Sequence, residues 1–282
     1  MNSQSSSVET SSTESSSITD DTHILRQIIV PTEDEARRIV SIIAKSWQDI
    51  PSNKWLFDGH PEAEECSMLS ILGSQYDVNS FGAQPKGSSY DSAKSQAGVD
   101  IWTSSGSDGE IKSIMAYKLP KKVYESEDLR GTLGQEIWSY LPEYKRDWLG
   151  SEYDKSWDEL EASLNVKKEN SIEYFLHTDP LSRSQGHGTK LVQKIKEISE
   201  ESGIPVWLAA HNDGARRFYN DKAGFEQGST VQFPLDNGKS TGITAFTYIP
   251  TTYNPSEDTA NDGPIEEPLW PEDISLMPES EH

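Results

Sequence analysis

Apolar positions recur along this chain with two periods, and their order predicts a mixed α/β domain. Strand-like runs cover residues 24–31, 99–103, 111–119, 171–178 and 204–210, and a last hairpin covers about 228–249. Helical spacing follows Thr32 and recurs over Pro61–Gly73, 127–165, 189–202 and 213–223, whereas Asn53–Phe57 interrupts it. This order predicts a layered sheet with one parallel β-α-β crossover at 171–210 and antiparallel pairing elsewhere.

The start of the first helix is marked by its own residues. Thr32 and Glu35 have the capping-box spacing, in which each side chain hydrogen-bonds to the backbone N–H of the other residue. Acidic residues also suit the first turn, because the N-terminal end of a helix carries partial positive charge. We therefore expect Thr32 to be the N-cap.

Both ends of the chain differ in composition from the middle. Residues 1–22 contain nine serines, and residues 251–282 contain nine acidic residues, five prolines and no Lys or Arg. Such segments bury too little apolar surface to offset the entropy of ordering them. We expect a disordered Ser-rich tail over 1–22, one domain over 23–250 with a helical insert at about 120–170, and a disordered acidic tail over 251–282.

The formal charge of −22 is concentrated in these ends, and residues 23–250 carry −9. An acidic body argues against a nucleic-acid partner and suits a cationic amine, although acidity that only maintains solubility explains it equally well. Cys66 is the single cysteine, no apolar run approaches the ~18 residues of a membrane span, and residues 1–22 lack the features of a secretory signal. A cytoplasmic protein without a membrane partner is expected, with the nucleus as the other compartment.

The clearest chemical signal lies between the strand at 171–178 and the helix at 189–202. The connecting loop reads Arg183-Ser-Gln-Gly-His-Gly188. Glycines allow a ligand to approach the main chain closely, and N–H groups at the start of a helix bind anions. The loop therefore predicts a phosphate or pyrophosphate site over 184–189, although a plain tight turn would use the same glycines. The dinucleotide fingerprint fails at Leu191, and no Gly-Lys-Ser/Thr of a P-loop follows.

This loop resembles the Arg/Gln-x-x-Gly-x-Gly/Ala signature of GNAT (GCN5-related N-acetyltransferase) proteins, with Arg183, Gly186 and Gly188 at its fixed positions. A second segment similar to the family follows in the expected order and reads Asn212-x-x-Ala215-x-x-x-Tyr219, then Gly224-Phe225. The resemblance is strong over about 171–226 and weaker over 24–57 and 99–119. Asp179-Pro180 and Ser46–Phe57 give a looser likeness to the puromycin-type and fungal small-molecule acetyltransferases.

The resemblance implies a GNAT fold: a mixed, mostly antiparallel central sheet with splayed fourth and fifth strands and helices on both faces. It also implies acetyl-CoA as the co-substrate. The six histidines and one cysteine lack metal-ligand spacing, so no metal is expected. Pantetheine would pair with the fourth strand and pyrophosphate would lie on the loop amides, while the His187 ring is expected to face solvent. The implied cofactor-binding residues are Leu176, His177, Thr178, Arg183, Ser184, Gln185, Gly186, His187, Gly188, Thr189, Asn212 and Tyr219.

The implied chemistry is direct transfer of the acetyl group to an amine in a ternary complex. Tyr219 is expected to protonate the leaving thiolate as general acid, although a core tyrosine would fit the same helix. Glu173 is the tentative base, with His177 and a water molecule as alternatives. Cys66 lies beside two glutamates, so a structural role is expected for it rather than acyl transfer.

The acceptor is the least constrained part of the prediction. Trp55 and Trp138 are the candidate substrate contacts, His211 is a further candidate, and the aromatic insert either caps the acceptor site or forms a small core. The leading prediction is acetylation of a primary amine of a small molecule by a monomer or homodimer. The alternatives are a protein or peptide acetyltransferase acting on lysine or N-termini, and a non-catalytic acyl-CoA-binding regulatory module.

Overall fold

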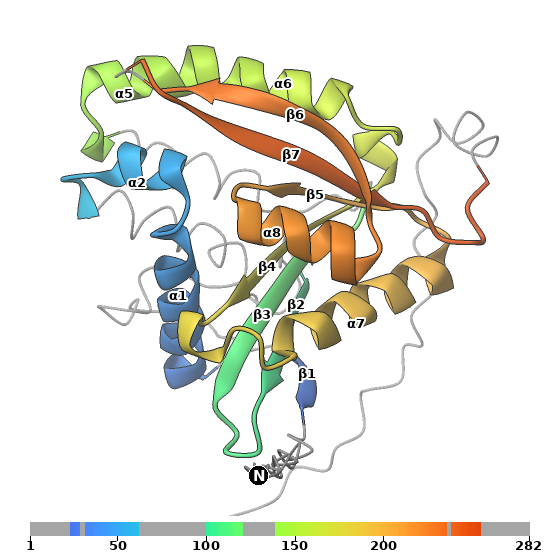
Figure 1. Cartoon of the computed structure of the whole chain (residues 1–282). Coiled ribbons are helices and arrows are strands. Elements are labelled where there is room, and N and C mark those ends of the chain that lie inside the picture. The colour runs from blue at the N-terminus through green and yellow to red at the C-terminus, as the bar shows by residue number, and fades with distance from the viewer. Residues whose placement is uncertain (1–22, 29–31, 62–99, 121–138, 236–237, 255–282) are drawn as a thin grey trace, which may run out of the picture.

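A computed structural model describes residues 23–28, 32–61, 100–120, 139–235 and 238–254 of the chain (Figure 1). The strands are β1 (Ile24–Ile28), β2 (Asp100–Ser105), β3 (Ile111–Lys118), β4 (Ile172–Thr178), β5 (Val206–Ala210), β6 (Glu226–Pro234) and β7 (Ser240–Tyr248). The α-helices are α1 (Glu33–Trp47), α2 (Pro51–Phe57), α5 (Glu143–Trp148), α6 (Asp154–Ala162), α7 (His187–Ser202) and α8 (Asp213–Phe218). Short π-helical turns η3 (Leu149–Tyr153) and η6 (Tyr219–Ala223) and 3₁₀ turns η4 (Lys168–Asn170) and η5 (Pro180–Ser182) complete the described elements. Among these helices, none has both the length and the apolar character that crossing a membrane requires.

The seven strands form one sheet in the order β1-β2-β3-β4-β5-β7-β6. The β4–β5 pair is parallel, and every other neighbouring pair in this sheet is antiparallel. This arrangement confirms the predicted mixed α/β class with a mostly antiparallel sheet.

The parallel pair separates soon after it begins. β4 and β5 are paired only at Ile172–Val206 and Glu173–Trp207. Beyond that point β4 follows β3 as far as Thr178, while β5 follows β7 as far as Ala210. The predicted splay of the fourth and fifth strands is therefore confirmed, and it leaves one edge of each strand's main chain facing a gap.

Side chains that alternate along the strands divide the core between two faces of the sheet. On β3, Ile114 and Ala116 belong to the cluster that contains Ile39 and Ile43 of α1. Met115 and Tyr117 belong to the opposite cluster, together with buried residues of α7 such as Leu191. Thus α1 and α2 cover one face, and α7 and α8 cover the other (Figure 1).

The helical insert covers the end of the sheet built by β6 and β7 (Figure 1). Leu160 of α6 is fully buried against Phe233, Ile243 and Ala245 of this hairpin. Lys145 of α5 is also buried, and its Nζ donates to the carbonyl oxygens of Leu56 at 2.9 Å and Asp58 at 3.0 Å. The insert thereby joins the β6–β7 hairpin to the α2 region on the same side of the molecule.

Several predicted boundaries need correction. Asn53–Phe57 lies in α2 rather than in an interruption, because Pro51 occupies the first helical position, where its fixed φ and missing N–H are tolerated. α7 begins at His187, two residues earlier than predicted, since Gly186 is its N-cap. The Thr32–Glu35 capping box is confirmed. Most of the predicted helix at Pro61–Gly73, and residues 127–138 of the insert, lie outside the described residues.

Candidate active site

The loop before α7 has the backbone geometry of an anion-binding site. Ser184 has a φ of 64° and Gly186 a φ of 93°, and the helix starts at the next residue. No described side chain caps this helix at Gly186. The first N–H groups of a helix lack intrahelical partners, so the start of α7 suits an anionic ligand.

Steric contacts explain why the two glycines stand in this loop. A Cβ added at Gly186 would lie 2.8 Å from His23 Nε2, and one added at Gly188 would lie 3.2 Å from Thr178 Oγ1. The loop is thus pressed against the end of β4 on one side and against the residue before β1 on the other. Glycine at these positions serves close packing as well as ligand access.

The His187 ring points into the protein, so the expected solvent-facing orientation is wrong. His187 is only 3% exposed, and its Nδ1 lies 2.9 Å from Ser104 Oγ. The ring stacks on His23 with the centroids 4.5 Å apart, and His23 Nε2 lies 2.8 Å from the carbonyl oxygen of Gln185. His187 stands one helical turn before buried Leu191, on the face of α7 that meets the sheet. These contacts hold the loop against β2 and against the residue before β1.

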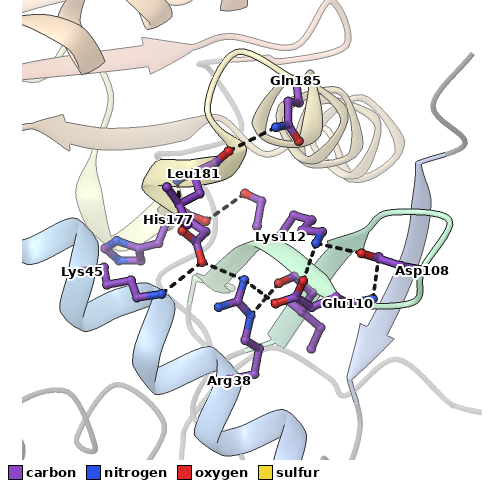
Figure 2. Close-up of polar contacts among 11 residues, drawn as sticks. Arg38, Lys45, Asp108, Glu110, Lys112, His177, Leu181 and Gln185 are labelled. Carbon is purple, nitrogen blue, oxygen red and sulfur yellow. Dashed lines mark hydrogen bonds and ion pairs between the residues drawn. The ribbon is translucent and has the colours of Figure 1, made fainter. Parts of the chain in front are cut away.

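The loop is also joined to α1 through a buried carboxylate (Figure 2). Asp179 is 3% exposed at its side chain, and its Oδ2 lies 2.7 Å from Arg38 Nη2 and 3.4 Å from Lys45 Nζ. Its Oδ1 accepts a hydrogen bond from the Leu181 N–H at 3.1 Å. Burial alone would raise the pKa of Asp179, but the Leu181 hydrogen bond and the Arg38 guanidinium outweigh it and hold that pKa below its usual value.

The first residue of the motif forms a more exposed contact. Arg183 Nη1 lies 2.6 Å from Asp49 Oδ2 just after α1, and both side chains are about half exposed. Gln185 Nε2 donates to the Leu181 carbonyl at 3.1 Å (Figure 2). Arg183 lies on the cavity wall described next, whereas Gln185 is not among the described residues that line it.

One cavity of about 1420 Å³ joins the loop to the gap between β4 and β5. Sites for a single small ligand typically measure roughly 300–1000 Å³, so this cavity has room for two reactants. Its wall includes all the predicted cofactor residues except Gln185: Leu176, His177, Thr178, Arg183, Ser184, Gly186, His187, Gly188, Thr189, Asn212 and Tyr219. Segments that are far apart in the sequence therefore meet at one site.

Asn212 and Tyr219 are held at this cavity by α8. Asn212 is the N-cap of α8, and its Oδ1 accepts the Ala215 N–H at 2.9 Å, which leaves its Nδ2 group for a ligand. Tyr219 is 6% exposed and packs against Tyr174 and Phe225. Burial raises the pKa of Tyr219, and the adjacent Tyr174 hydroxyl only partly opposes this rise. The phenol therefore stays protonated at neutral pH and can donate a proton.

Family membership follows from the segment that builds this site. Residues 137–225 match the sequence model of the Acetyltransferase (GNAT) family. This segment belongs to the GNAT superfamily. The protein is therefore an N-acyltransferase, and GNAT acetyltransferases use acetyl-CoA.

Solved GNAT structures resemble this chain in part. A histone acetyltransferase HPA2 and related acetyltransferase from Corynebacterium glutamicum shares 15% identity with a TM-score of 0.47, over 81% of this chain and 98% of that chain. A GCN5-related N-acetyltransferase from Kribbella flavida shares 10% identity with a TM-score of 0.40, over 80% and 97% of the two chains. The protein yncA of Salmonella typhimurium, in a structure with its cofactor acetyl-CoA, shares 8% identity with a TM-score of 0.41, over 80% and 93%. No curated protein matches the chain in a sequence comparison.

Glu173, the predicted base of this GNAT protein, lies on the cavity wall at the last β4–β5 pair. Its carboxylate forms an ion pair with Lys118 Nζ at 3.2 Å. Glu173, Phe175 and His177 share one face of β4, because side chains alternate along a strand. The contact of His177 with Ser46 of α1 identifies this as the face covered by α1.

The predicted substrate contact at Trp55 is not found on this wall. Trp55 packs against Trp148 with ring centroids 4.6 Å apart and lies near Lys145 Nζ, and it is not among the described residues that line the cavity. Trp138 lies outside the described residues. Trp55 therefore belongs to the packing between α2 and α5.

Three aromatic residues that do line the cavity come from the insert and from β5. Tyr153, Trp157 and Trp207 are on the cavity wall. The Trp157 ring lies 6.0 Å from Tyr153, 6.4 Å from Trp207 and 6.1 Å from His211, measured between ring centroids. Tyr153 and Trp157 belong to the aromatic insert that was predicted to cap the acceptor site or to form a small core, but neither they nor Trp207 were predicted as substrate contacts. The i, i+4 spacing of Tyr153 and Trp157 was a further signal, because it places both on one face of a helix.

Proposed function

We propose that this protein transfers the acetyl group of acetyl-CoA to a primary amine of a small molecule, by direct attack in a ternary complex. The observation that carries this proposal is the continuity of the cavity. It connects the uncapped start of α7 with the aromatic wall of the insert, and the β4–β5 gap lies between them. Two reactants that enter from these two sides would meet in the gap.

The residues of the cofactor side fit the groups of acetyl-CoA. The amides from Gly186 to Thr189 suit a pyrophosphate, and the unpaired edge of β4 at Leu176–Thr178 suits the amide groups of pantetheine, which would pair with it like an added strand. Asn212 Nδ2 would donate to the same arm. When bound, acetyl-CoA supplies the activated acyl group.

The protein's own groups would assist transfer at two points. A main-chain N–H near Leu176 or His177 would donate to the oxygen that becomes negative when the amine attacks. Tyr219 would donate its proton to the sulfur as the C–S bond breaks, because burial keeps this phenol protonated. Holding both reactants together supplies on the order of 7–11 kcal/mol of barrier reduction in favourable cases.

The small-molecule acceptor is supported by the way the insert covers the acceptor side. Tyr153 and Trp157 of η3–α6 and Trp47 and Phe57 of α1–α2 form walls around this side of the cavity. An extended peptide would need an exposed strand edge or an open groove there. Aromatic walls instead suit a compact amine with an apolar or aromatic body.

The test is incubation of the full chain with acetyl-CoA and each member of two panels: small primary amines, and basic or N-terminal peptides. Thiol release and acetylated product are measured. The proposal expects turnover with at least one small amine at a higher kcat/KM than with any peptide. Turnover of peptides alone would favour the protein acetyltransferase alternative. Binding of acetyl-CoA with no thiol release above background would favour the non-catalytic module.

A further inference from the structure

Unsatisfied polar atoms line the cavity. Of the seven buried side-chain atoms without a hydrogen-bond partner among the described residues, four belong to residues that line this cavity. Tyr174 Oη belongs to the cluster with Tyr219 on the α7–α8 face, and the three on the acceptor side are His177 Nε2, His211 Nδ1 and Trp207 Nε1. A buried polar atom without a partner costs about 1–3 kcal/mol, so such atoms are concentrated where a ligand satisfies them.

The two histidines lie near the ends of the two splayed strands. β4 and β5 are last paired at Glu173 and Trp207, and a histidine follows each of these residues four positions later. His177 is within β4, whereas His211 directly follows the last residue of β5. Alternation along β4 keeps His177 on the face of Glu173, and the His211 ring lies against Trp157, which also contacts Trp207. Both rings therefore project toward the acceptor side, on either side of the gap through which a thioester would reach the amine.

The contacts of Ser46 favour one tautomer of His177. The Ser46 hydroxyl donates its single proton to the Ile43 carbonyl at 2.8 Å. Ser46 Oγ also lies 2.6 Å from His177 Nδ1, and a hydroxyl that donates to Ile43 accepts in this contact from Nδ1–H. The other ring nitrogen, Nε2, is then left with a lone pair on the cavity side, where no described residue binds it.

Both rings are uncharged at neutral pH. Burial lowers the pKa of His177 to about 4, and the neighbouring His211 adds to this effect. Burial alone lowers the pKa of His211 to about 4. The other charged groups on the cavity wall come from the turn after α1 and from α6, β4, the loop, α8 and η6. They are Asp49, Asp154, Glu173, Arg183, Asp213, Arg217, Asp221 and Lys222. Among these, Asp49, Glu173 and Asp213 are paired with cations: Arg183, Lys118 and Arg216.

We propose that His177 is the catalytic base of this protein and that Ser46 is its positioning residue. This inference rests on the proposed function and identifies the group that accepts the proton from the amine. The amine enters as its free base and attacks the thioester carbonyl carbon. As the C–N bond forms and the C–S bond breaks, the amine proton passes to His177 Nε2 and the Tyr219 proton passes to the sulfur.

Glu173 is less suited to this task. It stands at the closed end of the gap, four residues before His177, which is about 13 Å along a strand. Its carboxylate also forms an ion pair with Lys118. The lone pair of His177 Nε2, by contrast, is unengaged and lies beside the stretch of β4 that is expected to hold the thioester.

His177→Asn removes the proposed proton acceptor and keeps the link to Ser46. The asparagine Nδ2 group can replace Nδ1–H as donor to Ser46 Oγ, but nothing replaces the Nε2 lone pair. We expect kcat to fall by roughly 10²–10⁴-fold, the range typical of a lost general base, with the Kd for acetyl-CoA unchanged. The matched control is His60→Asn, because His60 lies outside the cavity wall among the described residues.

Three further variants separate base catalysis from a structural role. In His177→Ala, added imidazole is expected to restore turnover in a saturable way, because it can enter the space of the missing ring. Ser46→Ala frees the His177 tautomer and is expected to lower kcat several-fold without changing the KM for acetyl-CoA, whereas Ser46→Thr restores it. If His177→Asn does not bind acetyl-CoA, the two Ser46 variants provide the test. An unchanged kcat in Ser46→Ala then overturns the inference.

The outcomes distinguish the two proposals. Wild-type protein that binds acetyl-CoA but turns over no amine contradicts the proposed function and this inference together. An active wild type with an equally active His177→Asn overturns this inference alone. So does loss of turnover in Glu173→Gln that matches or exceeds the loss in His177→Asn.

Discussion

The two sides of the cavity are built in different ways. The cofactor side depends on consecutive main-chain amides of one loop, residues 184–189, placed at the start of α7. The acceptor side depends on side chains from α1–α2, the insert, β4 and β5. This difference means that a main-chain site can be detected from glycine spacing in one stretch of sequence. A wall of side chains from separate segments cannot be detected in this way.

The largest effect is expected at Tyr219, where the cofactor side and the acceptor side of the cavity are expected to meet. In Tyr219→Phe the ring remains but no proton can reach the leaving sulfur. We expect kcat to fall by roughly 10²–10⁴-fold with an almost unchanged Kd for acetyl-CoA, as measured by steady-state kinetics and calorimetry. Tyr248→Phe is the matched control, because Tyr248 donates to Glu200 and is not among the described residues lining the cavity. Equal turnover by both variants would mean that Tyr219 is only a core residue.

The next effect concerns Asp179, which joins the cofactor loop to α1 of the acceptor side. Removing one partner of a buried ion pair costs about 3 kcal/mol, so Asp179→Asn should lower the free energy of unfolding by that order at pH 7. Chemical denaturation measures it. Asp108→Asn serves as the control, since Asp108 pairs with Lys112 in solvent and should have little effect.

This stabilisation has a defined pH dependence. The pKa of Asp179 is lowered in the folded state, so its contribution is fully present above the unfolded value of about 3.9 and is lost as the pH falls through the folded value. The difference in the free energy of unfolding between wild type and Asp179→Asn should therefore become smaller below about pH 4. A difference that stays constant from pH 7 to pH 3 would show that charge is not its origin.

A third variant weakens the cofactor side alone. Gly186→Ala places a side chain at a φ of 93° and against His23 Nε2. The left-handed conformation costs a non-glycine residue about 1–2 kcal/mol, so a loop that relaxes to avoid it should bind acetyl-CoA at least ~10-fold more weakly. Gly109→Ala carries a similar strain at a φ of 75°, with nothing within 4 Å of the new Cβ. It should lose stability but keep its affinity, and equal affinity in the two variants would contradict the loop assignment.

The smallest effect is expected on the acceptor side. Trp157→Ala removes aromatic contacts worth about 0.5–1.5 kcal/mol, so the KM for a small aromatic amine should rise by roughly 2–10-fold. The Kd for acetyl-CoA should not change. Tyr144→Ala, at an exposed position of α5, provides the comparison. A change in acetyl-CoA affinity instead would place Trp157 on the cofactor side.

The sequence predicted local features better than long-range contacts. The capping box at Thr32 and the Gly186-x-Gly188 loop are each defined by residues within a few positions of one another, and the structure has both. The His187 ring was misplaced because its partners, Ser104 and His23, are distant in the sequence. Trp55 was placed at the substrate for a similar reason, since its packing against Trp148 depends on how the insert folds back. The role of Ser46 in holding the His177 tautomer is another contact that only the fold creates.

Amide hydrogen exchange with and without acetyl-CoA tests the central claim most directly, because it reports where the cofactor binds without requiring the acceptor. Binding in the β4–β5 gap and at the start of α7 should slow exchange in peptides that cover 174–178 and 184–191. Peptides of β1 and of the β6–β7 hairpin should be nearly unchanged. Saturating acetyl-CoA that leaves 174–178 and 184–191 unprotected, or protects another region instead, would contradict the account.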